Sequence, residues 1–372
     1  MPINLAMSKL TYNNKNNIFF QSLKASVEKY FIDNKINKTG NWKLYTKTAI
    51  LLTSALSLYL ILLFVKLPAI LGIVLSCLFG FVLAIIGFNV MHDACHGCFS
   101  GKKWVNELFS YSLNLLGGSS FFWKYKHNIL HHTYTNVDGL DDDIGKSPLM
   151  RQCTSQKWVP AHRYQHIYVI GVYAIASLAW IFFMDFDKYV KQKIHNTPLQ
   201  RMSAKEHIIF WLTKIFYVLF YIVIPIKLLG WQSWAVGFIL LHIFMGLTLA
   251  IVFQLAHVVE HTEFEFAGAE DRVVESAWAV HEIRSTADFA QGNKIVTWLV
   301  GGLNYQVEHH LFPRICHVHY PALSKIVSAK CREFNLPYHT FPTMTSAVVS
   351  HFKIMKQLGA SPDGVNNMSP AT

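Results

Sequence analysis

Long runs of hydrophobic residues divide this chain into two pairs of apolar segments. The runs cover approximately residues 46–65, 68–90, 208–228 and 232–256. Each is close to the roughly 20 residues that a helix needs to cross a bilayer. The breaks inside the pairs are short, Lys66-Leu67-Pro68 in the first and Leu229-Gly230-Trp231 in the second. The pattern therefore predicts four transmembrane helices arranged as two hairpins.

Two shorter apolar segments need separate interpretations. Residues 19–31 place hydrophobic side chains at steps of three and four, which predicts an amphipathic helix within a polar amino-terminal segment, residues 1–45. Residues 167–184 have the length of a short span. A span there would put the basic segment 185–207 on the far side of the membrane, against the positive-inside tendency. We therefore interpret 167–184 as an interfacial helix, and we predict a disordered tail over 357–372.

Composition supports a membrane protein. Hydrophobic residues make up 52% of the 372 residues and charged residues only 15%, whereas soluble domains are about a quarter charged. The formal net charge is +11, but the basic residues flank apolar spans, which is typical of membrane orientation and not of a nucleic-acid-binding face. We expect an all-α, multi-pass integral membrane protein with interfacial helices, a cytosolic helical cap and both termini cytosolic.

Three tight clusters of histidine lie beside the predicted spans. They are His92-x-x-x-His96, His127-x-x-x-His131-His132 and His309-His310, the last preceded by Gln306. Imidazole is the commonest ligand for transition metals in proteins. Positions i and i+4 share one face of an α-helix, whereas adjacent residues diverge by about 100°, so each doublet suits two metal ions better than one. In the predicted topology all three clusters meet on the cytosolic side.

A further histidine just past the last span completes the predicted set of metal ligands. The eight candidates are His92, His96, His127, His131, His132, His257, His309 and His310. Weaker candidates are His261 and the amide oxygen of Gln306. Asp93 and Glu308 are placed to orient imidazoles as hydrogen-bond partners. We interpret the acidic run from Asp138 to Asp143 as a solvated loop, with a role in orienting imidazoles as the alternative. We leave His317 and His319 out of the predicted set because they lie past Pro313. Six histidines that fit no cluster are interpreted as structural: His162, His166, His195, His207, His242 and His281.

The chemistry of this ligand set indicates iron. Ligation by nitrogen with few carboxylates fits a first-row transition metal, and iron is the best match where oxygen chemistry is required. The Glu-x-x-His motifs of carboxylate di-iron bundles are absent from the sequence. No protein acid or base separate from the metal ligands is predicted.

These motifs resemble the three histidine boxes of the membrane fatty acid desaturase superfamily, HxxxH, HxxxHH and (H/Q)xxHH. The segments His131–Gly139 and Gly301–Pro313 resemble its acyl-lipid or front-end branch, which makes Δ5, Δ6 and Δ8 double bonds. The resemblance extends over about residues 20–350. It implies a desaturase domain over 46–356 that holds two iron ions in a cytosolic cap. With O2 and two electrons, such a centre removes two hydrogens from adjacent methylenes and leaves a cis double bond.

The resemblance also implies partners. The substrate would be a fatty acyl-CoA or an acyl-lipid held at the bilayer. Many front-end members carry a fused cytochrome b5 domain with a His-Pro-Gly-Gly haem motif, and that motif does not occur in this chain. We therefore expect an external electron donor, either ferredoxin or free cytochrome b5.

Other classes of protein share parts of this pattern. A di-iron membrane hydroxylase of fatty acids, alkanes or carotenoids would have the same metal site, although the Gln-type third box favours desaturation. A metal transporter would place histidines inside its spans, where only His242 lies, and a haem protein would use single axial histidines in place of doublets. A catalytically inactive protein that keeps the iron site has the same motifs.

Overall fold

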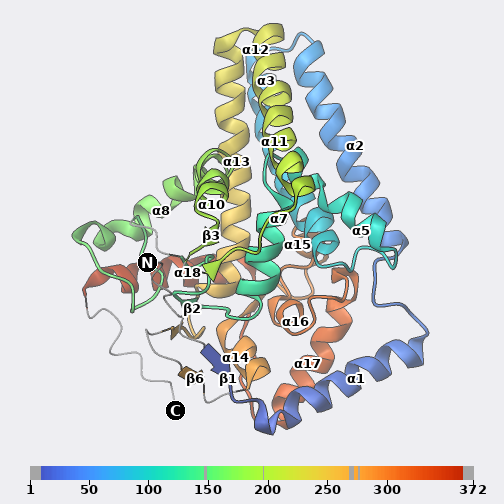
Figure 1. Ribbon diagram of the computed structural model, residues 1–372, viewed down its shortest axis with the longest axis vertical. Helices are drawn as coiled ribbons and strands as arrows, with labels where there is room; N and C mark the ends of the chain where they lie inside the picture. Colours follow the sequence, from blue (N-terminus) through green and yellow to red (C-terminus); the bar gives the residue numbers. More distant parts are fainter. Residues whose placement is uncertain (1–9, 146–148, 196, 268–271, 275–276, 363–372) are drawn as a thin grey trace.

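The chain forms a narrow helical stalk above a broader cap (Figure 1). The computed structural model describes residues 10–145, 149–195, 197–267, 272–274 and 277–362. Four long apolar helical segments form the stalk: Trp42–Phe64, Ala69–Cys95, Ala204–Leu229 and Trp231–His257. The four predicted spans are thereby confirmed, and their ends differ by one to five residues from the bounds expected from the sequence.

The spans are assembled from shorter regular elements. The first is α2 (Trp42–Phe64). The second consists of α3 (Ala69–Ile86), the π-helix η2 (Gly87–Met91) and α4 (His92–Cys95). The third consists of α11 (Ala204–Val218), the π-helix η6 (Leu219–Val223) and α12 (Ile224–Leu229), and the fourth is α13 (Trp231–His257).

Glycine allows the second and fourth spans to approach closely. A Cβ atom on Gly80 would lie 2.1 Å from the carbonyl oxygen of Leu241, so any larger residue would push α3 and α13 apart. Small residues at such crossings let helix backbones pack directly in a membrane. Away from this seam the stalk is covered by exposed aliphatic side chains such as Ile70, 78% exposed, as expected for a surface in contact with lipid.

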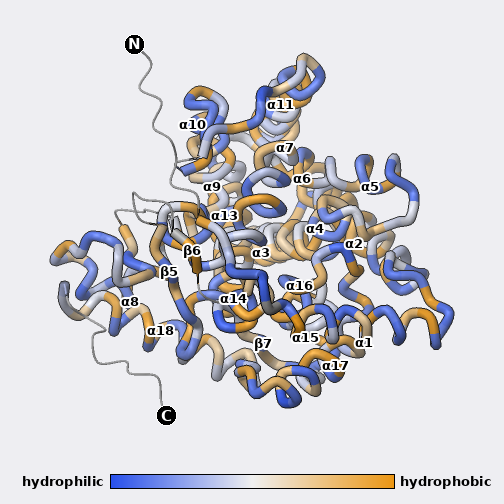
Figure 2. The backbone as a smooth tube through the Cα atoms, turned by 60° about the horizontal axis from the view of Figure 1, so that its bottom comes forward, coloured by the Kyte–Doolittle hydropathy of each residue, from blue (hydrophilic) through white to orange (hydrophobic). Residues whose placement is uncertain are grey.

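The cap is built from short helices and contains both ends of the described chain. Hydrophilic residues lie on its outer loops (Figure 2). Its α-helices are α1 (Ile18–Asn34), α5 (Lys103–Ser110), α6 (Ser112–Leu115), α7 (Ser120–Trp123), α8 (Gln165–Ala174), α9 (Ala176–Ala179), α10 (Asp185–Lys191), α14 (Trp278–Ser285), α15 (Lys294–Leu299), α16 (Gln306–Leu311), α17 (Tyr320–Glu333) and α18 (Met344–Ala360). It also contains π-helices η3 (Lys124–His131) and η5 (Trp180–Met184), and 3-10 helices η1 (Asn14–Asn16), η4 (Pro160–Tyr164) and η7 (His317–His319).

Short strand pairs connect these helices. Three pairs are parallel: β1 (Leu10–Tyr12) with β6 (Arg272–Val274), β2 (Val137–Asp138) with β5 (Glu265–Phe266), and β7 (Asp288–Phe289) with β8 (Thr340–Phe341). The fourth, β3 (Lys193–Ile194) with β4 (Thr197–Pro198), is antiparallel. Each pair holds a loop in place, and none extends into a larger sheet within the described part of the chain.

The amphipathic segment near the amino terminus packs on the cap. Phe19, Leu23, Val27 and Phe31 lie on one face of α1 and are buried in a cluster with residues of α14, α16 and α17. Because α16 carries His309 and His310, this hydrophobic cluster packs against the helix that contains the third histidine motif.

Two segments differ in detail from the sequence expectation. Residues 167–184 form α8, α9 and η5, within a helix pair that bends by 58° between Ala174 and Ala176. At the carboxyl end, α18 continues to Ala360 because Leu358 is buried. The predicted tail therefore begins as helix, and residues 363–372 lie outside the described residues.

Candidate metal centre

The eight histidines predicted as ligands come together beneath the stalk. His92 and His96 continue the second span, and His257 ends the fourth. His127 and His131 lie in η3, and His132 follows it directly. His309 and His310 lie in α16, and all eight side chains are buried. Helices that are distant in the sequence therefore converge on one site at the junction of stalk and cap.

The ring nitrogens of these histidines fall into two groups. The first group has ligand atoms within 4.8 Å of one another and consists of His92, His96, His127 and His309. The second group, defined in the same way, consists of His131, His257 and His310. His132 lies between them, because it forms a further such set with His309 and His310. Two groups with a shared neighbour can hold two metal ions.

A π-helix sets the geometry of the second motif. The backbone N–H of His132 donates to the carbonyl oxygen of His127 at 3.1 Å, a step of five residues. As a result the Nε2 atoms of His127 and His132 lie 3.2 Å apart. The step of four that we expected from an α-helix therefore does not describe this segment, in which the residues five apart also meet.

Three imidazoles are held at Nδ1 by a side chain outside the cluster. Asp141 lies 3.0 Å from Nδ1 of His131, and Glu282 lies 2.9 Å from Nδ1 of His310. The hydroxyl of Tyr320 lies 3.0 Å from Nδ1 of His309. Such partners fix the ring orientation and leave Nε2 for a metal.

Asp93 occupies a comparable position beside His92. One of its carboxylate oxygens lies 3.9 Å from Nδ1 of His92. The other accepts from Nδ1 of His317 at 2.8 Å and from the thiol of Cys316 at 3.0 Å. The ammonium group of Lys47 in turn lies 3.1 Å from Nε2 of His317. Asp93 is thus fixed by groups from the first span and the η7 region.

Burial and crowding keep most of the imidazoles neutral. Burial first, and then the proximity of other histidines, lower the pKa of His127, His132, His309 and His310 well below the usual value. Burial acts on His131 as well, but the neighbouring Asp141 outweighs it and raises the pKa of that side chain. Neutral imidazole is the form that binds a metal ion.

The residues present fit metal ions better than they fit a protein core. Among the described residues, buried nitrogens without a hydrogen-bond partner include Nε2 of His92, His96, His131, His257, His309 and His310. An unpaired buried polar atom costs about 1–3 kcal/mol, so this concentration would be unfavourable unless ligands satisfy it. The all-nitrogen donor set matches a first-row transition metal such as iron.

Gln306 and His261, the less strongly predicted ligands, and Glu308, a predicted hydrogen-bond partner of the imidazoles, lie in three different environments. Gln306 is buried at the first position of α16. His261 is exposed, outside both groups, with its ring 5.9 Å from that of His339. Glu308 accepts from the hydroxyl of Tyr338 at 2.9 Å, and burial followed by the nearby Asp288 raises its pKa. Ligation by Gln306 or His261 stays a prediction.

Sequence reasoning missed several residues that hold the cluster. The expectation of a solvated loop over Asp138–Asp143 is wrong for Asp138 and Asp141, which are buried, because Asp141 is hydrogen-bonded to His131. Glu282 and Tyr320 carried no signal in the sequence, because they lie 28 and 11 residues from their histidines and outside the three motifs. His317 was left out of the predicted set because it lies past Pro313, although its closeness to the third motif and to Cys316 could have indicated its position near Asp93.

Four apolar spans over a buried cluster of eight histidines define a multi-histidine integral membrane protein. Comparison with known proteins names the family. Residues 68–342 match the fatty acid desaturase family. The sn-1 linoleoyl-lipid 6-desaturase of Arthrospira platensis is 34% identical over 360 residues, which are 96% of each chain.

Two further relatives have similar identity. The sn-1 linoleoyl-lipid 6-desaturase of a Synechocystis species is 33% identical over 92% of this chain and 95% of its own length. An acyl-lipid (8-3)-desaturase of Physcomitrium patens is 34% identical over 93% of this chain and 72% of its own length. The chain belongs to the fatty acid desaturase family, and it is an oxidoreductase that acts on fatty acyl chains.

Proposed function

We propose that this protein is a front-end desaturase that introduces a cis double bond into the acyl chain of a membrane lipid. The observation that carries the proposal is the pair of buried histidine groups with unpartnered nitrogens, beside four membrane spans. The names of the relatives, 6-desaturases and an (8-3)-desaturase that act on lipid-bound chains, support the regiochemistry and the substrate.

The proposed centre is held by the eight histidines. Two iron ions bound there would supply the oxidising chemistry with O2 and two electrons, and the reaction would release water. The protein would orient the ligands through Asp141, Glu282, Tyr320 and Asp93. Burial of the cluster beneath the stalk excludes bulk water from a strongly oxidising site. Gln306 and His261 remain candidates for additional ligands of this centre.

The proposed orientation places the cap and both termini in the cytosol. The hairpin tips carry Lys66, in the break after α2, and Lys227, in α12, whereas the described elements of the cap carry many more basic residues, such as Lys103, Lys124 and Lys188. Cytosolic segments are enriched in Lys and Arg. The catalytic domain would then extend over residues 46–356. Electrons would come from a separate protein, ferredoxin or cytochrome b5.

The test combines product analysis with metal analysis. The chain is expressed in a host fed saturated, mono- and di-unsaturated fatty acids, and methyl esters are analysed by gas chromatography–mass spectrometry. We expect a new double bond between an existing one and the carboxyl end. His309→Ala should abolish the product and reduce bound iron while the protein still inserts in the membrane.

A matched histidine outside the cluster provides the control. His195 has a left-handed backbone, φ of 52°, which asparagine tolerates, so His195→Asn should keep both iron and product. Normal activity in the His309→Ala variant would contradict the assignment. A hydroxylated product would move the protein to the di-iron hydroxylases.

A further inference from the structure

A cavity of about 930 Å³, the stalk cavity, lies between the two helical hairpins in the half of the stalk farther from the cap. Its walls come from α2, α3, the segment of η6 and α12, and α13. Along α13 it extends from Gln232 to Leu241, a depth of about 14 Å at 1.5 Å per residue. The hydrocarbon core of a bilayer is roughly 30 Å thick. The stalk cavity therefore has the depth of one leaflet, the leaflet away from the cap (Figure 1).

Aromatic side chains close the inner end of the stalk cavity. The rings of Tyr59, Phe79 and Tyr221 come from three different spans, and their centroids lie 6.2, 6.3 and 6.4 Å apart. The hydroxyl of Tyr59 also donates to the carbonyl oxygen of Phe220 at 2.8 Å, which joins α2 to η6. Next to this aromatic floor, Gly80 lets α3 and α13 pack in direct contact. An acyl chain that enters the stalk cavity therefore ends at this floor, short of the histidine cluster.

The inner surface of the stalk cavity offers few free groups to water. The hydroxyl of Ser76 donates to the carbonyl oxygen of Gly72, and the indole N–H of Trp234 donates to that of Tyr221, both at 2.8 Å. Together with the hydroxyl of Tyr59, these donors are already hydrogen-bonded within the protein. An ordered water needs about two to four polar partners. The depth of the cavity therefore favours an apolar occupant.

The stalk cavity opens to the surface that faces lipid. Phe64, Leu228 and Val236 line it, and all three are exposed. Gly72 also lines it, and a Cβ atom added there would have no atom within 4 Å. An empty space of this kind would lose the van der Waals contacts of its lining. The molecules that surround such an opening in a bilayer are lipids, and their acyl chains match an aliphatic and aromatic wall.

The rim of the stalk cavity, at the hairpin tips, carries a positive charge. Lys66, in the break between α2 and α3, is the only charged residue among the described residues that line the cavity. Gln232 and Ser233, at the start of α13, lie at the same rim. Residues 42–92 and 207–259 contain no Asp or Glu. The two hairpin tips therefore provide no carboxylate that could compensate Lys66, and an anion from outside the protein is required.

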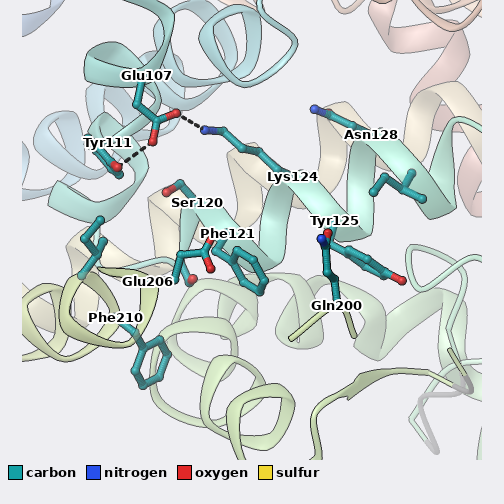
Figure 3. Close-up of a pocket in the computed structure, with 13 residues that line it drawn as sticks. Glu107, Tyr111, Ser120, Phe121, Lys124, Tyr125, Asn128, Gln200, Glu206 and Phe210 are labelled. Atoms are coloured by element: carbon teal, nitrogen blue, oxygen red, sulfur yellow. Dashed lines mark hydrogen bonds and ion pairs between the residues drawn. The ribbon is translucent and has the colours of Figure 1, made fainter. Parts of the chain in front are cut away.

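The cavity beside α5, η3 and the start of α11 has a different charge balance (Figure 3). Lys124 lines it, but the ammonium group is 2.9 Å from the carboxylate of Glu107. Glu206 adds a second carboxylate to the lining. The cation of that cavity is thus compensated inside the protein, whereas no carboxylate lines the cavity that contains Lys66.

We propose that the stalk cavity binds a phospholipid of the leaflet away from the cap, with one acyl chain inside the cavity and the phosphate at Lys66. This lipid is a structural component of the stalk and not a substrate, because the aromatic floor separates it from the histidine cluster. It fills the space between the two hairpins and thereby stabilises their packing. The proposal goes beyond the proposed function and does not depend on it.

Native mass spectrometry in detergent measures the lipid that each chain holds. The delipidated full-length protein is titrated with dioleoyl phosphatidylglycerol or with dioleoylglycerol, which has the same acyl chains and no phosphate. We expect a complex with one phosphatidylglycerol per chain, bound about tenfold more tightly than dioleoylglycerol. Equal affinity for the two lipids would overturn the proposal. A monomer that binds neither lipid, or a dimer without lipid, would overturn it as well.

The position of the acyl chain is tested by filling the cavity. In Gly72→Phe the added ring enters the open space that the chain would occupy, so affinity for phosphatidylglycerol should fall about tenfold. Gly171→Phe is the matched control. Gly171 is also a helical glycine whose added Cβ would meet no atom within 4 Å, and it does not line the cavity. Equal affinity in the two variants would contradict the assignment of the chain to the stalk cavity.

The position of the phosphate is tested through charge, with variants that leave the packing of the spans unchanged. Lys66→Gln should weaken phosphatidylglycerol binding about fivefold and leave dioleoylglycerol binding unchanged, whereas Lys66→Arg should keep the wild-type affinity. Lys227→Gln is the control, because Lys227 is exposed on the other hairpin tip and does not line the cavity. An equal loss in Lys66→Gln and Lys227→Gln would contradict the assignment of the phosphate to Lys66.

Discussion

The helix α13 carries two buried histidines that differ in the hydrogen bonding of their ring nitrogens. His242, in the membrane part of the stalk, has Nδ1 2.9 Å from the hydroxyl of Ser177 and Nε2 2.6 Å from the hydroxyl of Tyr217. His257, where the helix enters the cap, has no hydrogen-bond partner for either ring nitrogen among the described residues. Both side chains are almost fully buried, 0% and 4% exposed.

The difference separates a structural histidine from a candidate ligand. A buried polar atom is normally paired inside the protein, and His242 follows this rule. His257 departs from it, as do five other members of the two histidine groups that each have an unpaired ring nitrogen: His92, His96, His131, His309 and His310. Burial or proximity to a span therefore does not identify a ligand, whereas unpaired nitrogens that converge from several helices do.

Exchanging the two histidines of α13 for alanine gives the largest expected effects. His257→Ala should lower desaturation by at least about a hundredfold and reduce bound iron, because a ligand has more effect than the outer partners that orient it. His242→Ala should keep its iron but lower the free energy of unfolding by roughly 2 kcal/mol, through a cavity and two lost hydrogen bonds.

Metal analysis and thermal unfolding in detergent distinguish these outcomes. Full iron occupancy in the His257→Ala variant would contradict the assignment of His257 as a ligand. So would a folded His242→Ala protein that has lost iron.

Removing the charge behind one ligand should have the next largest effect. Asp141→Asn keeps the shape of the side chain but weakens its hold on Nδ1 of His131, so iron affinity should fall about 10- to 100-fold. Chelator competition followed by iron analysis measures this change. Asp187→Asn is the matched control, because Asp187 is about half exposed and pairs with Lys191. Equal iron retention in both variants would show that Asp141 does not orient a ligand.

A second buried histidine with both ring nitrogens hydrogen-bonded, His351, makes stability depend on pH. His351 donates from Nδ1 to the carbonyl oxygen of Val258 at 2.7 Å and lies 2.9 Å from the hydroxyl of Tyr173. Burial lowers the pKa of His351 to about 4. Because the unfolded chain then binds the proton more readily, the stability contributed by this side chain is present above about pH 6.5 and is lost as the pH falls toward 4.

The control for this effect is a side chain that does not titrate. Between about pH 6.5 and 5, the wild type should lose about 2 kcal/mol more stability than His351→Gln. Denaturant unfolding in detergent at the two pH values measures the difference. A parallel loss in both proteins would show that His351 is protonated without cost.

The smallest effect is expected at the hydroxyl that holds His309. Tyr320→Phe removes a neutral hydrogen bond to Nδ1, worth about 1 kcal/mol, so iron affinity should fall about fivefold. This is less than for Asp141→Asn, since a charged partner forms the stronger bond. A larger loss in Tyr320→Phe, again by chelator competition, would reverse this order.

The stalk could be predicted from sequence in more detail than the support of the metal centre. The spans follow from apolar length, and the histidine motifs from spacing within one helix. Asp141 was misinterpreted because its run of acidic residues has the composition of a solvated loop. Glu282 and Tyr320 reach His310 and His309 only through the packing of α14 and α17 on α16, and no local pattern encodes that packing.

The π-helix η3 makes the length of this segment as important as its histidines. A helix that lost one residue between Lys124 and His131 would return to the α-helical step, and the spacing that brings His127 next to both His131 and His132 would be lost. The aspartate, hydroxyl and imidazole partners would all remain in the sequence, yet His127, His131 and His132 would no longer have the relative positions on which the two histidine groups depend. Deletions in family members should therefore be tolerated in the loops on either side of η3 and be absent within it.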